Sequence, residues 1–188
     1  AKVTDGAHKT PKYIESGVPF LRVTDIQSTE INVRKTKYIS NSEHLDLCRR
    51  CKPEKGDIIY SKNGTIGISK IVNWDWDFSI FVSLALLKLH DKNVLQVEFL
   101  DLFLQSPLVA KQIKDRAKQG TVTNLHLEEI KNFDVVVPST EEQSKIKNII
   151  GAIESRIHNV KQKLTQTQSL KKSLTQDLLT GKVRVSIN

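Results

Sequence analysis

The sequence predicts an α+β fold in two parts: a strand-rich globular domain over residues 1–138, and a coiled-coil arm over residues 139–188 that consists mainly of one long C-terminal helix ending near Gly181. The first part contains short apolar stretches with an alternating period, separated by turn residues, which is typical of strands. The second part repeats apolar residues at steps of three and four, which is a helical period. Because the chain holds no second helix of comparable length, we expect the arm to need a partner.

Both ends of the long helix carry sequence signals. Ser139-x-x-Glu142 and Thr140-x-x-Gln143 form overlapping capping boxes, and Gly181 lies where a glycine would close the last turn. At about 1.5 Å per residue, a helix of this length measures roughly 60 Å. One small domain is too narrow to cover such a rod, so we expect most of its apolar stripe to meet another helix.

The apolar stripe consists of Ile146, Ile149, Ile150, Ile153, Ile157, Val160, Leu164, Leu170, Leu174 and Leu178. Strict four-three spacing continues through Thr167 and Lys171, but these two residues are polar. We interpret Leu170, Leu174 and Leu178 as a seam shifted by one residue, which indicates a stutter or a change of partner along the rod. A helix of an ordinary bundle is the alternative interpretation.

Composition and charge restrict the class of protein. The chain has 188 residues and a net charge of +8, and residues 141–184 hold nine of its 29 lysines and arginines against four carboxylates. A basic balance favours a polyanionic partner. There is no apolar run of membrane-spanning length, no signal-peptide core and no Met, so the N-terminus is expected to be a processing or cloning boundary. Two cysteines without a disulfide framework fit a reducing cytoplasm.

The expected elements before the arm are, in order, strands over 20–26 and 31–39, a helix over 42–48 capped by Ser42, a turn over 53–56, a hairpin of strands 57–62 and 65–72, a buried strand over 78–89, helices over 97–104 and from Ser106-Pro107, a helical turn over 127–131 and a strand over 133–137. The clearest signal is Asn63-Gly64 in the hairpin. This dipeptide is favoured in a type I′ turn, where both central residues need a positive φ.

No catalytic motif is present. The chain lacks H-E-x-x-H, G-x-S-x-G, the phosphate-loop and dinucleotide-binding glycine patterns, and a nuclease carboxylate cluster. Cys48-Arg-Arg-Cys51 has no second cysteine pair for zinc, although His44 would offer a third ligand, and we interpret both as ordinary cysteines. The sequence therefore predicts no catalytic residue, no metal and no cofactor.

Three polar and basic places fit a polyanion: the hairpin with Lys62, Asn63, Thr65 and Lys70, the loop 119–124 after a basic helix, and His8-Lys9-Thr10. Amides, hydroxyls and lysines are the groups that contact phosphate oxygens and base edges. A solvated loop is the alternative at each place.

The order of several short motifs resembles one family. Asp5-Gly-Ala-His-Lys-Thr-Pro11 followed by GVPFLRVTDI (17–26) resembles the opening of a target recognition domain of type I restriction–modification DNA specificity subunits. KGDIIYS (55–61) with GTIG (64–67) is similar to its central hairpin, and Gln119-Gly-Thr121 with Pro138 to its closing segment. EEQSKI (141–146) and LLTGKVRV (178–185) resemble the two ends of its conserved helical spacer.

The resemblance implies a non-catalytic subunit that reads one half of a bipartite DNA site. Its long helix would pack against a second such helix, fix the distance between the half sites and dock methyltransferase (modification) subunits, with restriction subunits recruited by the complex. A complete subunit has two recognition domains and two spacers, whereas this chain has one of each. We therefore expect either a half-subunit that dimerises, most simply as an antiparallel pair, or a fragment of a full subunit.

The candidate residues follow from these patterns. For base reading we select Lys62, Asn63, Thr65, Gln119, Thr121, Thr123 and Asn124, and for phosphates Lys9, Arg49, Arg50, Lys70 and Lys118. For pairing of the long helix with a second copy we select Ile146, Ile150, Ile153, Ile157, Val160, Leu164, Leu174 and Leu178. Two other classes stay open: a protein-interaction module with a coiled-coil arm and no specific DNA binding, and an enzyme with an unrecognised site, such as a nuclease.

Overall fold

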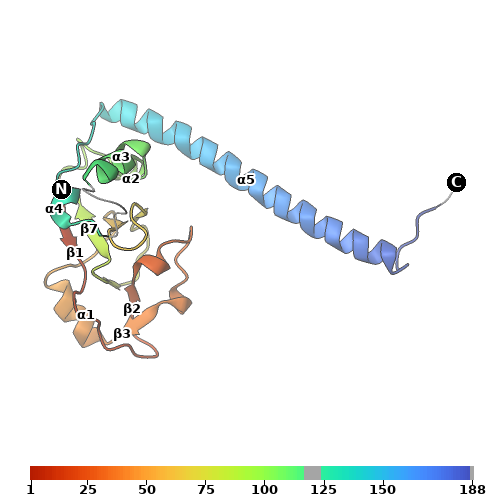
Figure 1. Cartoon of the computed structure of the whole chain (residues 1–188), viewed down its shortest axis with the longest axis horizontal. Coiled ribbons are helices and arrows are strands. Elements are labelled where there is room, and N and C mark those ends of the chain that lie inside the picture. The colour runs from red at the N-terminus through yellow and green to blue at the C-terminus, as the bar shows by residue number, and fades with distance from the viewer. Residues whose placement is uncertain (117–123, 187–188) are drawn as a thin grey trace. The chain divides into compact units, whose positions relative to one another are not determined.

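The computed structural model describes residues 1–116 and 124–186 of the chain (Figure 1). The fold is mixed α+β with a long C-terminal helix, as predicted, and it divides into two compact units, Ala1–Ser144 and Lys145–Asn188. Among the described residues, no helix is both long enough and apolar enough to cross a membrane. The predicted domain boundary after residue 138 stays a prediction.

A four-stranded antiparallel sheet forms the middle of the first unit. Its strands lie in the order β1 (Lys2–Asp5), β7 (Leu84–Lys88), β4 (Ile58–Ser61) and β5 (Ser69–Ile71). The central strands read as continuous apolar runs, because both faces of the sheet are covered. Successive side chains point to opposite faces, so Leu84 and Leu86 enter one core and Ala85 and Leu87 the other.

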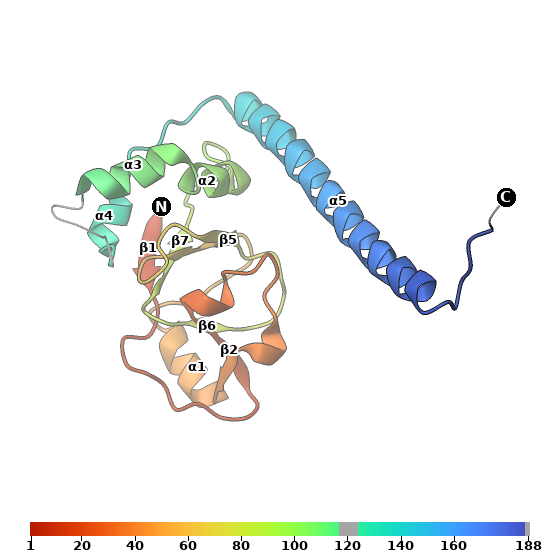
Figure 2. The same ribbon diagram turned by 45° about the vertical axis from the view of Figure 1, so that its right-hand side comes forward.

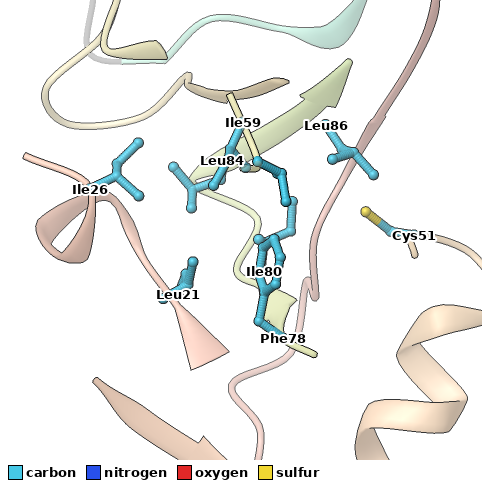
Figure 3. Close-up of a cluster of buried hydrophobic side chains, with 9 residues drawn as sticks. Leu21, Ile26, Cys51, Ile59, Phe78, Ile80, Leu84 and Leu86 are labelled. Carbon is cyan, nitrogen blue, oxygen red and sulfur yellow. The ribbon is translucent and has the colours of Figure 1, made fainter. Parts of the chain in front are cut away.

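A smaller three-stranded sheet lies in the same unit. It consists of β3 (Lys37–Ile39), β2 (Val18–Leu21) and β6 (Ser79–Ile80), with β2 antiparallel to β3 and parallel to β6. One core fills the space reached by both sheets. Figure 3 shows its buried side chains, including Leu21 and Ile80 from the small sheet and Leu84 from the large one.

Helices cover the two ends of this unit. Helix α1 (Asn41–Cys48) packs on β6, whereas α2 (Val97–Leu104), α3 (Pro107–Arg116) and α4 (Leu127–Lys131) belong to the other end. Both views show α2 beside α3, away from α1 and β2 (Figures 1 and 2). The helices predicted at 97–104, from Ser106-Pro107 and at 127–131 are confirmed.

Several predicted elements differ in their extent. The strand expected over 20–26 ends at Leu21, because the Asp25 carboxylate accepts hydrogen bonds from the backbone and the guanidinium of Arg22 and closes a 3₁₀ turn, Val23–Asp25. The strand expected over 31–39 begins only at Lys37, after a second 3₁₀ turn, Val33–Lys35. The cap of α1 is Ser40, not Ser42, since Ser40 Oγ accepts from the Glu43 nitrogen at 3.2 Å.

The apolar run 78–89 forms two strands in different sheets rather than one. The chain turns at residues 81–83, where the Leu84 nitrogen donates to the Phe81 oxygen at 2.9 Å. The segment after β1 crosses this turn, and the Ala7 nitrogen donates to the Ile80 oxygen at 2.9 Å. A Cβ on Gly6 would lie 1.9 Å from the Ile80 oxygen, so the crossing requires glycine.

The strand predicted over 133–137 is wrong, because this segment is irregular. A side-chain amide replaces the neighbouring strand: Gln112 donates to the Asp134 oxygen and accepts from the Asp134 nitrogen, each at 2.9 Å. Val135 still packs against a core cluster, but Val136 and Val137 are exposed, with 67% of Val136 accessible to solvent. Alternation in FDVVV indicated a strand, but no strand within residues 1–116 and 124–186 is paired with it.

The long helix α5 spans Thr140–Leu179 without interruption. Ser139 Oγ accepts from the Glu142 nitrogen at 3.3 Å, which confirms the predicted cap, and Gly181 adopts a positive φ of 72° after the last turn. Its nitrogen donates to the Leu178 oxygen at 3.2 Å, and the Val183 nitrogen donates to the Asp177 oxygen at 3.1 Å. These bonds satisfy carbonyl groups that a helix end leaves free.

Candidate functional site

The loop between β4 and β5 is the centre of the candidate site. The two strands are antiparallel, as predicted, but the type I′ turn is wrong because Asn63 does not have a positive φ. The Ser61 nitrogen donates to the Ile68 oxygen at 2.8 Å, so residues 62–67 form a wider loop. A loop of this length can display side chains that a two-residue turn would hold in line with the strands.

Contacts of this loop bring a second candidate segment next to it. Asn63 forms an isolated antiparallel bridge with Asn124, and the Leu125 nitrogen donates to the Lys62 oxygen at 2.7 Å. The Lys62 nitrogen is itself bound to the Ser83 oxygen at 2.9 Å. The hairpin loop and residue 124 therefore lie side by side, although they are some 60 positions apart in the sequence. Lys118, Gln119, Thr121 and Thr123 lie outside the described residues.

A buried carboxylate joins the third candidate segment to the hairpin. Asp5 is 4% exposed in its side chain, and Lys62, which is 7% exposed, places its ammonium 3.5 Å from Oδ2 of Asp5. Arg50 also binds the Asp5 carboxylate and donates to its backbone oxygen at 3.1 Å. His8 Nε2 lies 3.1 Å from Asp5 Oδ1 and 3.0 Å from the Arg50 guanidinium. Two cationic side chains and one imidazole thus surround one carboxylate.

The burial of Lys62 changes its expected part in the site. A lysine that reads bases must reach the solvent with its ammonium, whereas Lys62 is enclosed and ion-paired with Asp5. Its assignment as a base reader stays a prediction, but in this conformation it connects the loop to β1. Arg50 is half-exposed and partly engaged by Asp5, and Arg49 is exposed beside Asp46 at 3.3 Å.

The other polar side chains of the hairpin face a segment that the sequence patterns did not indicate. Gln27 Nε2 donates to Thr65 Oγ1 at 3.1 Å, and Lys70 Nζ donates to the Thr29 oxygen at 2.8 Å. The run QSTE (27–30) is polar and mostly exposed, and its polarity after a predicted strand was the available signal. Burial lowers the pKa of Lys70, and the nearby Asp101 opposes this effect.

A cavity of about 340 Å³ is lined in part by Asp5. It is bordered by Asp5, His8, Lys9, Glu43, Asp46 and Arg50 among other residues. Lys9 is exposed and lines it together with Asp46 and Arg50. Cations and carboxylates are mixed along this border, so the cavity by itself selects no charge.

Both cysteines are free thiols, with Cys48 half-buried and Cys51 buried. Cys48 Sγ lies 3.5 Å from His44 Nε2, whereas Cys51 Sγ accepts from Thr4 Oγ1 at 3.6 Å. His44 is buried, and its Nδ1 lies 2.9 Å from Ser79 Oγ. No group of three or more His, Cys, Asp or Glu among the described residues is arranged to hold a metal ion. Burial raises the pKa of both thiols.

The pairing residues predicted on α5 lie along its exposed surface. Exposed fractions are 54% for Ile153, 48% for Ile157, 58% for Val160, 57% for Leu164, 47% for Leu174 and 44% for Leu178, while Ile146 and Ile150 are half-buried. An apolar stripe of this length is unusual on a free helix in water. The described residues of Lys145–Asn188 contain no other helix that covers it.

Comparison with known proteins decides the family. A model of the type I restriction modification DNA specificity domain matches residues 8–168. The chain belongs to this family. It is 27% identical over 166 residues to the type I restriction enzyme EcoBI specificity subunit of Escherichia coli, an alignment that covers 88% of this chain and 35% of that subunit.

Solved structures share the fold of this specificity domain. A chain from a structure that describes assembly and conformational transition of the type I R-M system aligns with a TM-score of 0.67 and 20% identity, over 92% of this chain and 40% of that one. The HsdS subunit from Thermoanaerobacter tengcongensis aligns with a TM-score of 0.64 and 18% identity, over 95% of this chain and 41% of that one. The specificity domain described here therefore spans well under half of these relatives.

Proposed function

We propose that residues 1–144 read one half of a bipartite DNA site as the recognition part of a type I restriction–modification enzyme, and that the chain itself has no catalytic role. The convergence of the hairpin loop, residue 124 and the segment around Asp5 supports this. It places amides, hydroxyls and lysines from distant parts of the sequence in one region. Such groups read base edges and hold phosphates.

In this proposal Asn63, Thr65 and Asn124, with Gln119, Thr121 and Thr123, face the bases. Lys9, Arg49, Arg50, Lys70 and Lys118 face phosphates, while Lys62 holds the loop against Asp5. A type I specificity domain of this kind docks methyltransferase subunits, and restriction subunits join through the complex. The family match over residues 8–168 supports these partners, since it includes most of α5.

We further propose that α5 pairs with a second copy of the chain in antiparallel orientation. Complete burial of one Leu or Ile side chain contributes about 1.5–3 kcal/mol, and the seam side chains are about half exposed. Pairing two such seams therefore offers more than 10 kcal/mol before the cost of association. Two identical copies would read two inverted half sites separated by a fixed spacer.

The test is binding of the full chain to a randomised DNA library, followed by salt titration of the selected sequence. Asn63→Ala should relax one base position at a cost of about 1–3 kcal/mol. Lys9→Gln should weaken all sequences alike and reduce the salt slope by about 1. Lys111→Gln on α3, which is ion-paired with Asp115, serves as the matched control. Binding without any sequence preference would favour the protein-interaction module instead.

A further inference from the structure

The apolar seam of α5 is symmetric under reversal of the helix. Its positions alternate by four and three residues from end to end: Ile146, Ile150, Ile153, Ile157, Val160, Leu164, Thr167, Lys171, Leu174 and Leu178. Leu174 and Leu178 follow Thr167 and Lys171 by seven residues each, so they continue the same heptads. The shifted seam expected from the sequence is therefore wrong for Leu174 and Leu178. Only Leu170 lies outside the continuous seam.

We propose that two copies of α5 pair antiparallel in a single register whose twofold axis passes level with Gln162. This inference rests on the proposed pairing with a second copy and specifies it. In this register each seam residue meets one of the other copy: Val160 with Leu164, Ile157 with Thr167, Ile153 with Lys171, Ile150 with Leu174 and Ile146 with Leu178. Core positions of antiparallel coiled coils meet in such pairs.

Coverage of the exposed residues selects this register over its neighbours. If the axis moves toward the N-terminus by half a heptad, Leu174 and Leu178 have no counterpart, and these are 47% and 44% exposed. If it moves the other way by the same amount, Ile146 and Ile150 have none. A shorter pairing centred near Ser155 matches apolar residues only, but it leaves the same two leucines uncovered.

Charge gives the register a second signature. Residues 155–176 contain Arg156, Lys161, Lys163, Lys171 and Lys172 and no Asp or Glu. With the axis at Gln162, Lys161 and Lys163 each face their own counterpart across the pair. Four ammonium groups then surround the axis, so salt should strengthen the dimer instead of weakening it.

Single-cysteine cross-linking of the full chain tests the register. In a background with Cys48→Ala and Cys51→Ala, Lys163→Cys should form a covalent dimer with a short bismaleimide, and Arg156→Cys should not. The reverse result would establish the shorter pairing. A direct disulfide in Leu164→Cys would show parallel helices, and a monomeric mass with no cross-link would remove the second copy. Each of these three results overturns the proposal.

The dissociation constant gives an independent readout. Lys163→Gln should tighten the dimer about twofold at low salt, whereas Lys147→Gln, which faces Thr175 in this register, should leave it unchanged. An equal effect of both substitutions would overturn the proposed axis. DNA binding by the same variants separates the proposed register from the proposed DNA recognition. The affinity for a single half site depends on residues 1–144 and not on the register of α5.

Discussion

The Lys62 ammonium lies 3.5 Å from Oδ2 of Asp5, and both side chains are more than nine-tenths buried. The pair connects the loop after β4 to the end of β1, so its integrity determines where the hairpin displays Asn63 and Thr65. We expect Asp5→Asn to lower the free energy of unfolding by about 3–5 kcal/mol, because it leaves buried Lys62 without its counter-charge. Urea unfolding of the full chain measures this.

Lys62→Met should cost less than Asp5→Asn, because Asp5 keeps Arg50 and His8 as partners. The double variant should recover part of the loss, as expected of coupled residues. Arg49→Ala is the matched control, since Arg49 and Asp46 are both largely exposed and should contribute little. Strictly additive effects of the two buried substitutions would contradict the coupling.

Gln143 is expected to be the most sensitive polar residue of the first turn of α5. It is completely buried, its Oε1 accepts from the Gln96 nitrogen at 2.8 Å, and its Nε2 donates to the Val94 and Pro138 oxygens at 2.8 and 2.9 Å. Gln143→Leu removes the side-chain amide, so its three backbone partners lose these hydrogen bonds. Each buried polar group left unsatisfied costs about 1–3 kcal/mol. We expect a clear fall in the unfolding midpoint of the globular unit.

Gln166→Leu provides the control for this prediction, because it makes the same change at an exposed position of the same helix. Ser144→Ala should lower the unfolding midpoint by an intermediate amount, since the Ser144 hydroxyl forms hydrogen bonds with the Gln96 side chain. If Gln143→Leu and Gln166→Leu lowered the midpoint equally, the buried hydrogen bonds would not be the cause.

Elements with a clear period could be predicted from the sequence, and elements that depend on distant contacts could not. Helices α2, α3 and α5 follow their apolar period and end signals closely. The run 78–89 shows only that its residues are buried. Its division at residues 81–83 depends on the Ala7 backbone, which arrives from the other end of the domain. Likewise, the alternation in 133–137 did not indicate that the Gln112 amide would form hydrogen bonds with the backbone oxygen and nitrogen of Asp134.

The candidate site shows the same limit. Residue types and turn signals predicted that the hairpin and the segment around Lys9 belong to the candidate site, because amides and lysines in loops can contact the bases and phosphates of DNA. They could not show that Lys62 is buried, since its partner Asp5 lies 57 positions earlier. Nor could they find Gln27 and Thr29, which reach Thr65 and Lys70 only through the folded chain.

A lysine that binds two carboxylates should stabilise the domain over a defined range of pH. Lys88 Nζ lies 2.6 Å from Asp57 and 2.9 Å from Glu54. Burial opposes the charge of Lys88, but the hydrogen bonds to Asp57 and Glu54 raise its pKa overall. The hydrogen bond from Lys88 lowers the pKa of Glu54. Stability from a raised lysine pKa is present below its ordinary value of about 10.4 and is lost as pH rises further.

The acid side follows from Glu54, whose lowered pKa contributes stability above its ordinary value of about 4.3 that is lost as pH falls. Lys88→Met should therefore lower the melting temperature by a nearly constant amount between about pH 5 and 10, and the difference should narrow on both sides of this window. Melting curves at several pH values measure it. Lys55→Met, whose exposed partner is Asp75, is the control. A difference that persists unchanged at pH 3 would contradict the assignment.

The polar positions of the α5 seam offer a way to change the spacer between half sites. Deletion of residues 165–171 removes Thr167 and Lys171 and brings Leu174 and Leu178 directly after Leu164 in the same heptad. The shortened seam is apolar throughout, so we expect a tighter dimer. Seven residues correspond to about 10 Å of helix, or roughly three base pairs at 3.4 Å each. The preferred spacer should therefore shorten by about three base pairs.

Selection from DNA libraries with variable spacers measures this preference. The matched control is the full-length double variant Thr167→Leu/Lys171→Leu, which should also tighten the dimer but keep the original spacer, because the helix length is unchanged. The two variants thus separate helix length from seam stability. If the deletion tightened the dimer and left the spacer unchanged, the helix pair would not set the distance between the two half sites.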